Sequence, residues 1–96
     1  MMRSYKLHFI VYPEADEEGL KAIVDKITQT ITAHGGQVAE VKSRGKRKLA
    51  YPIRKFEEGY DVVMQAGLEL KGIQELERSL KLSEPIILYL LVRTDE

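Results

Sequence analysis

Two extended segments follow one another directly, with no helix between them, in QVAEVKSRGKRKLAYPIRKFEEGYDVVMQAGLEL, residues 37–70. In the second segment apolar side chains alternate over residues 60–68, which is the period of a half-buried strand. In the first segment Gly45 predicts a bend or bulge, and Pro52 favours the edge of a sheet. The turn between the segments is predicted at Glu57–Gly59. This pair of strands sets the topology, because each flanking region then supplies one strand and one helix.

The flanking regions complete the order β-α-β-β-α-β. Residues 5–13 are rich in β-branched and aromatic side chains and predict a strand, and residues 84–94 predict another. Residues 15–36 and 71–82 carry apolar stripes at helical spacing. This order predicts an α+β, ferredoxin-like fold, with a four-stranded antiparallel sheet in the order 4-1-3-2 and two helices on one face. We expect one such domain to occupy residues 1–96.

Alternation along the strands assigns side chains to the two faces of this sheet. The residues predicted to face the helices include Tyr5, Leu7, Phe9, Val11, Leu49, Tyr51, Ile53, Tyr60, Val62, Met64, Ala66 and Leu68. The other face, which we call the open face, is predicted to carry Lys6, His8, Ile10, Tyr12, Lys46, Lys48, Ala50, Pro52, Arg54, Val63 and Gln65. From the last strand it is predicted to carry either Ile87, Tyr89 and Leu91 or the residues that alternate with them. Its apolar members predict a protein–protein interface, although long lysine stems could also cover them.

Positive charge is concentrated in one segment of a chain whose formal net charge is zero. Residues Lys42–Lys55, which we call the basic strip, hold seven basic residues and no acidic residue, whereas the rest of the chain holds eight basic and fifteen acidic residues. Lysines also protect edge strands from aggregation, but one or two suffice for that purpose. The density of the strip therefore favours contact with a polyanion, in particular with phosphate groups.

Composition excludes several classes of protein. The chain has no cysteine, so disulfides and thiolate metal sites are excluded, and a reducing, cytoplasmic location is expected. The longest apolar stretch, residues 85–92, is too short to span a bilayer, and the N-terminus lacks the apolar region of a signal peptide. No metal or cofactor is expected.

The sequence also argues against catalysis and against base stacking by the central strands. The loop YPEADEEG, residues 12–19, is acidic and would repel the phosphate of an ester substrate, and no P-loop motif occurs. His8 and His34 are predicted to stand alone. An RNA-recognition-motif domain would need aromatic side chains on the open face of its third strand, where this chain offers Asp61, Val63 and Gln65.

The segment RKLAYPIRKFEEGY, residues 47–60, resembles the signature region of the bacterial small-subunit ribosomal protein six family. The resemblance covers nearly the whole chain, and it implies a structural component of the 30S subunit and no enzyme. It further implies binding to the central domain of 16S ribosomal RNA together with small-subunit ribosomal protein eighteen.

On this interpretation the residues expected to contact RNA are Arg3, Tyr5, Lys42, Arg44, Lys46, Arg47, Lys48, Arg54, Lys55 and Arg93. Those expected to contact the protein partner are His8, Ile10, Tyr12, Ala50, Pro52, Val63, Ile87 and Tyr89.

One departure from the family pattern concerns the last strand. Many members of the family carry basic residues early in this strand, whereas PIILYLL, residues 85–91, is apolar here. This surface therefore either contacts RNA more weakly or meets protein. The alternative to a ribosomal role is an oligomeric ferredoxin-like module that binds an anion or a small molecule. That alternative predicts a homo-oligomer, whereas the ribosomal interpretation predicts a monomer in isolation.

Overall fold

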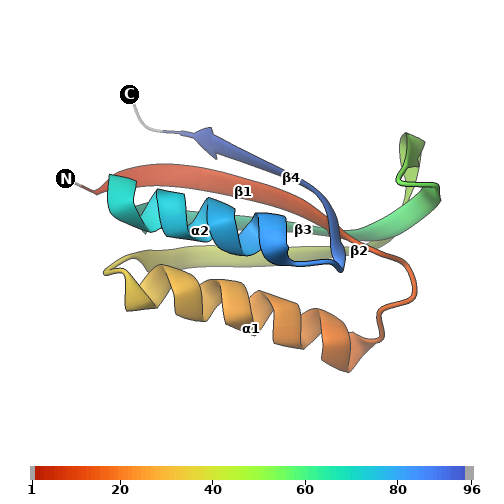
Figure 1. Cartoon of the computed structure of the whole chain (residues 1–96), viewed down its shortest axis with the longest axis horizontal. Helices are drawn as coiled ribbons and strands as arrows, with labels where there is room; N and C mark the ends of the chain where they lie inside the picture. Colours follow the sequence, from red (N-terminus) through yellow and green to blue (C-terminus); the bar gives the residue numbers. More distant parts are fainter. Residues whose placement is uncertain (1, 95–96) are drawn as a thin grey trace.

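The computed structural model describes residues 2–94. Its elements are β1 (Arg3–Val11), α1 (Glu17–Ala33), β2 (Gln37–Ile53), β3 (Phe56–Leu68), α2 (Leu70–Leu82) and β4 (Ile86–Arg93). The strands form one antiparallel sheet in the order β2-β3-β1-β4, and both helices lie on one face of it (Figure 1). The predicted ferredoxin-like fold and strand order are confirmed.

The core lies between the helices and the two central strands. Leu7 of β1 pairs directly with Met64 of β3, and Phe9 pairs with Val62, so that alternate residues of both strands point to the helices. These four side chains are almost completely buried. Burial of each stabilises the fold by roughly 1.5–3 kcal/mol. From the helix layer they meet Ile27, Ile31, Ile73, Leu76 and Leu80. The predicted alternation in these strands is therefore confirmed.

The ends of α1 follow from local sequence. The Asp16 side chain accepts a hydrogen bond of 2.7 Å from the backbone N–H of Gly19 and so caps the N-terminus of the helix. After the helix, Gly35 adopts a φ of 79°, a conformation that glycine reaches without steric cost.

The turn between β2 and β3 lies at Arg54 and Lys55, and the prediction of a turn at Glu57–Gly59 is wrong. Arg54 and Lys55 have φ values of 50° and 72°, as a two-residue hairpin turn of type I′ requires. Gly59 instead lies within β3, where it is buried against β1. The resulting long β2–β3 hairpin projects beyond the helices, at the end of the molecule opposite to the two termini (Figure 1).

A bulge in β2 changes which residues face the helices. The register shifts between Ser43 and Lys46, where Gly45 has a φ of 77°. Lys42 pairs with the open-face residue Val63, whereas Lys46 pairs with Tyr60 on the helix side. Because directly paired residues share a face, Lys46 and Lys48 lie on the helix side, and their predicted placement on the open face is wrong.

The pairing of β1 with β4 also shifts in register, between Ile10 and Val11. This shift changes which residues of β4 face the helices. Tyr89 pairs with Phe9 and therefore faces the helices, while Ile87 is only 7% exposed. The assignment of Ile87 and Tyr89 to an exposed open-face patch is thus wrong, and the alternate set of residues in this strand takes their place. The β4 residues that do face the open side are Leu88, Leu90 and Val92, and they are 42%, 58% and 45% exposed.

The first strand also contributes less to the open face than predicted. Ile10 does point to that side, but it is only 7% exposed, and Gly59 of the neighbouring strand β3 lies close to it. Tyr12 lies beyond the end of β1 and packs against the core, with its ring edge-on to Phe56 at a centroid distance of 6.3 Å. Neither residue forms part of an exposed patch.

Candidate nucleic-acid interface

The charges of the basic strip are almost entirely uncompensated. In the part of the chain that the structure describes, only Arg44 among its seven basic residues forms an ion pair with a carboxylate. Lys46 lies over the ring of Tyr60, with its Nζ 5.4 Å from the ring centroid. Arg47 Nε donates to the carbonyl oxygen of Arg44 at 3.3 Å. The strip therefore offers six cationic groups whose charge is free to attract phosphate.

The hairpin that carries the strip is held against the sheet at two points. Arg54 Nη1 donates to the carbonyl oxygens of Glu84 and Ile86, at 3.4 and 3.5 Å, and so reaches the start of β4. On the other strand, Phe56 packs edge-on against Tyr12. Both contacts restrict the tip of the hairpin, which lowers the entropy lost when its side chains bind a partner.

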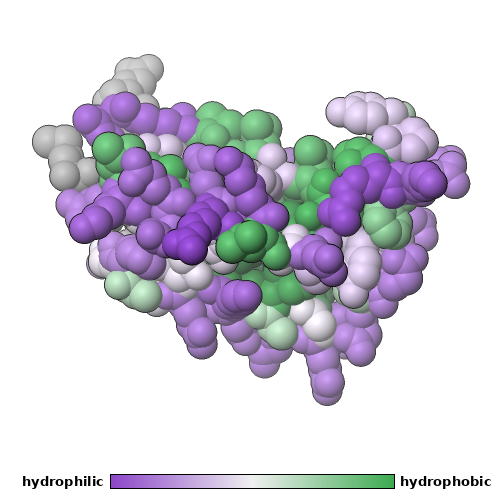
Figure 2. Space-filling view, viewed as in Figure 1, coloured by the Kyte–Doolittle hydropathy of each residue, from purple (hydrophilic) through white to green (hydrophobic). Residues whose placement is uncertain are grey.

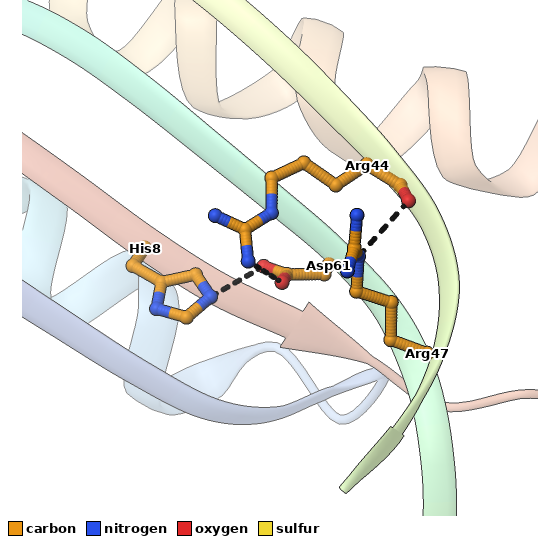
Figure 3. Close-up of polar contacts among 4 residues, drawn as sticks. All are labelled: His8, Arg44, Arg47 and Asp61. Carbon is orange, nitrogen blue, oxygen red and sulfur yellow. Dashed lines mark hydrogen bonds and ion pairs between the residues drawn. The ribbon is translucent and has the colours of Figure 1, made fainter.

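Asp61 lies at the centre of the open face and joins three strands (Figure 3). Its carboxylate is buried, and its two oxygens contact His8 Nε2 of β1 and Arg44 Nη2 of β2, the latter at 3.0 Å. His8 is therefore paired, and the prediction that it stands alone is wrong. A buried carboxylate needs such partners, because desolvation strongly disfavours an unpaired charge. The cluster fixes Arg44 within the bulge of β2.

The open face changes in character from one edge to the other. One row of directly paired residues crosses all four strands, from Lys42 through Val63 and His8 to Leu90. Its β2 end is basic and its β4 end is apolar. Seen from the helix side, Figure 2 shows hydrophilic surface over most of the helix layer and hydrophobic surface at the upper rim, over the middle of β4.

The residues predicted to contact RNA fall into two separate groups. Arg3, Tyr5 and Arg93 lie at the end of the sheet that carries the termini, where Tyr5 pairs with Arg93. The basic strip begins near the middle of the sheet and ends at the hairpin tip. The nine residues of β1 alone span about 27 Å, so one phosphate cannot contact both ends.

Within the strip, the three apolar residues that were predicted to face the helices differ in burial. Leu49 and Ile53 are half-buried, but Tyr51 is 67% exposed, so the prediction that Tyr51 packs on the helix side is wrong. The register shifts between Lys48 and Ile53, which interrupts the regular alternation on which that prediction depended. Ala50 and Pro52 are exposed on either side of Tyr51.

Sequence reasoning did not identify Asp61 as a functional residue. The available signal was that Asp61 is the only charged residue among residues 60–68, which are otherwise mostly apolar. Its partners lie 53 and 17 positions away in the sequence, so local spacing could not reveal them.

The arrangement is suited to binding. Within residues 2–94 no group of three or more His, Cys, Asp or Glu side chains could hold a metal ion. No helix in this range is long and apolar enough to cross a membrane. What the surface does offer is fixed cationic groups at one edge and exposed aliphatic side chains at the other.

Comparison with known proteins gives a consistent result. The family model described as ribosomal protein S6 matches residues 4–93. The small ribosomal subunit protein bS6 of Moorella thermoacetica is 44% identical over 99% of this chain and 97% of its own length. That of Thermoanaerobacter pseudethanolicus is 41% identical over 99% of this chain and its full length. The crystal structure of 30S ribosomal protein S6 from Thermotoga maritima matches with a TM-score of 0.92 and 30% identity, covering 98% of this chain and 89% of that one.

Proposed function

The chain belongs to the ribosomal protein S6 family of the small ribosomal subunit, and from this premise we propose that it binds the central domain of 16S ribosomal RNA together with small-subunit ribosomal protein eighteen. The family is one of ribosomal components and not of enzymes. The proposed place of action is the cytoplasmic ribosome. The single observation that carries RNA binding is the basic strip, because six of its seven cations have no carboxylate partner in the described chain.

The strip alone supports only weak binding with little sequence preference. Phosphate contacts position a protein on RNA but carry no sequence information directly. The chain also has no net charge, so long-range attraction by the whole molecule does not add to that of the strip. A protein partner that adds contacts and fixes the orientation would supply both affinity and register.

The apolar side of the open face supports the binding of that partner. Leu88, Leu90 and Val92 expose aliphatic surface along the edge strand β4. Three side chains are few against the roughly 1,200–2,000 Å² that a stable protein interface buries. We therefore expect the chain to be a monomer in isolation, and the partner to contact His8 and Val63 as well. A stable homodimer in gel filtration would contradict this expectation.

Binding of the pure protein to a 16S central-domain fragment, with and without protein eighteen and at several salt concentrations, tests the proposal. We expect tight, salt-sensitive binding only when the partner is present. Lys42→Glu combined with Arg47→Glu should weaken it, because both residues face the open side. Loss of two phosphate contacts should reduce the slope of log affinity against log salt by about 1.4–1.8.

A matched control carries the same change in charge on the helix layer. Lys21→Glu combined with Lys71→Glu alters two exposed lysines, one on each helix, and should leave the salt slope unchanged. If both double variants weakened binding equally, the effect would be one of net charge and the strip would not be the RNA contact. Absence of RNA binding by the wild type under every condition would reject the proposed function.

A further inference from the structure

Tyr51 differs from every other aromatic residue of the chain. The other six aromatic side chains are buried or half-buried, and each belongs to the core, packs against it or contacts a neighbouring ring or lysine. The Tyr51 side chain is 67% exposed near the tip of the β2–β3 hairpin. Within residues 2–94 its ring takes part in no aromatic or cation–π contact. The fold therefore makes no evident use of this ring.

Cationic side chains flank the ring on both sides in the sequence. Lys48 lies three residues before Tyr51, and Arg54 and Lys55 lie three and four residues after it. None of these cations has a carboxylate partner among the described residues. Glu58 lies opposite Lys48 in the register without an ion pair to it. An exposed aromatic face between phosphate-binding cations is the combination by which proteins hold single-stranded nucleic acid.

The backbone around Tyr51 is also restrained. The contacts of Arg54 with the start of β4 and of Phe56 with Tyr12 fix the hairpin just beyond the ring. A ring on a restrained backbone loses less conformational entropy on stacking than a ring on a free loop does. Tyrosine itself has few side-chain torsions to restrict.

We propose that Tyr51 stacks on an unpaired base of the bound RNA, while Lys48, Arg54 and Lys55 hold the phosphates on either side of that nucleotide. This inference rests on the proposed function and adds to it a contact with a base. It predicts that the hairpin tip contacts a single-stranded or bulged nucleotide of the RNA, because only an unstacked base offers its face to a side chain. The flanking charge favours RNA over a protein surface as the occupant.

Two variants at position 51 and one control variant on α2 test the proposal in the complex of the chain, protein eighteen and the 16S central-domain fragment. Tyr51→Ala should weaken RNA binding by about 5- to 150-fold, the range that corresponds to loss of one base–aromatic stack. Tyr51→Phe keeps the ring and should bind within about threefold of the wild type. The third, Leu82→Ala, removes a side chain that is 73% exposed on α2, and should leave RNA affinity unchanged.

The salt dependence separates stacking from charge. Because Tyr51→Ala removes no cation, the slope of log affinity against log salt should stay at the wild-type value, whereas Lys48→Ala should lower it by about 0.7–0.9. Unfolding by urea should show equal midpoints for wild type and Tyr51→Ala, since the ring is exposed.

Other outcomes would overturn the inference. If Tyr51→Ala bound RNA as the wild type does, stacking would be wrong while the proposed function stood. If Tyr51→Phe lost as much affinity as Tyr51→Ala, the contact would be a hydrogen bond of the hydroxyl group. If Tyr51→Ala weakened binding of protein eighteen in the absence of RNA, the ring would be a protein contact. If the wild type did not bind the RNA at all, the proposed function would fail and this inference with it.

Discussion

Asp61 shows how one carboxylate can organise a surface that is otherwise basic and apolar. Asn would keep its shape but remove the charge that pairs with His8 and Arg44. We expect Asp61→Asn to lower the free energy of unfolding by about 1–3 kcal/mol, since it leaves hydrogen-bonding groups at a buried site imperfectly satisfied. Urea unfolding would register this as a lower midpoint with an unchanged slope.

Asp25→Asn provides the control for that experiment. Asp25 is exposed on α1, so this substitution makes the same chemical change away from the sheet. It should shift stability by no more than about 0.5 kcal/mol. A double-mutant cycle with Arg44→Gln would then measure the coupling between the two partners. Equal stabilities of Asp61→Asn and Asp25→Asn would mean that the cluster contributes little to the fold.

At the scale of the element, the close approach of β3 to the end of β1 depends on Gly59. A Cβ atom added there would lie 2.5 Å from Ile10 Cγ2 and 2.8 Å from the carbonyl oxygen of Val11. The second atom is backbone and cannot move aside cheaply. We expect Gly59→Ala to destabilise the protein by about 1–3 kcal/mol, as overpacking does, measured by thermal or urea unfolding.

Gly45→Asn is the comparison for Gly59→Ala, because it separates conformational strain from collision. Gly45 has a positive φ, but a Cβ atom there would meet nothing within 4 Å, and asparagine tolerates this conformation well. Its loss of stability should be the smaller of the two. If Gly45→Asn lowered the free energy of unfolding more than Gly59→Ala did, the close approach of β3 to β1 would not be the reason for glycine at position 59.

The elements themselves were largely predictable from the sequence. The alternation of Leu7, Phe9, Val62 and Met64 identified the two central strands and their buried face, and the antiparallel order followed from the succession of elements. The faces of β2 and β4 were not predictable in the same way. A bulge adds one residue to a strand, and every side chain beyond it then moves to the other face. Lys46 and Tyr89 were misplaced for this reason.

The candidate site was predictable only where it is contiguous in sequence. The basic strip is one uninterrupted segment, so its charge could be counted directly. The contact of Asp61 with His8 depends on the register of two strands that are separated by a helix and a hairpin. The exposure of Tyr51 depends on a register shift near the hairpin tip, which no residue pattern in LAYPI, residues 49–53, announces.

At the scale of the whole molecule, the open face has a basic edge and an apolar edge. The proposed assembly uses the basic edge for RNA and the apolar edge for the protein partner. Leu90→Lys places a charge in the exposed apolar row of β4. Because Leu90 is 58% exposed, the free energy of unfolding should change by no more than about 0.5 kcal/mol. Binding of purified protein eighteen in the absence of RNA should weaken by about tenfold or more, since a charge at the centre of an apolar contact must lose its hydration without a partner.

Leu70→Lys and Leu82→Lys are the controls for this charge, because these leucines are 71% and 73% exposed on the helix layer, away from the open face. Titration calorimetry with purified protein eighteen should show wild-type affinity for both and reduced affinity for Leu90→Lys. Equal affinities of all three variants for protein eighteen would mean that this partner does not bind at the exposed row of β4. If instead Leu90→Lys bound protein eighteen normally but lost RNA binding, the β4 edge would meet RNA, and the division of the open face into a basic RNA side and an apolar protein side would be wrong.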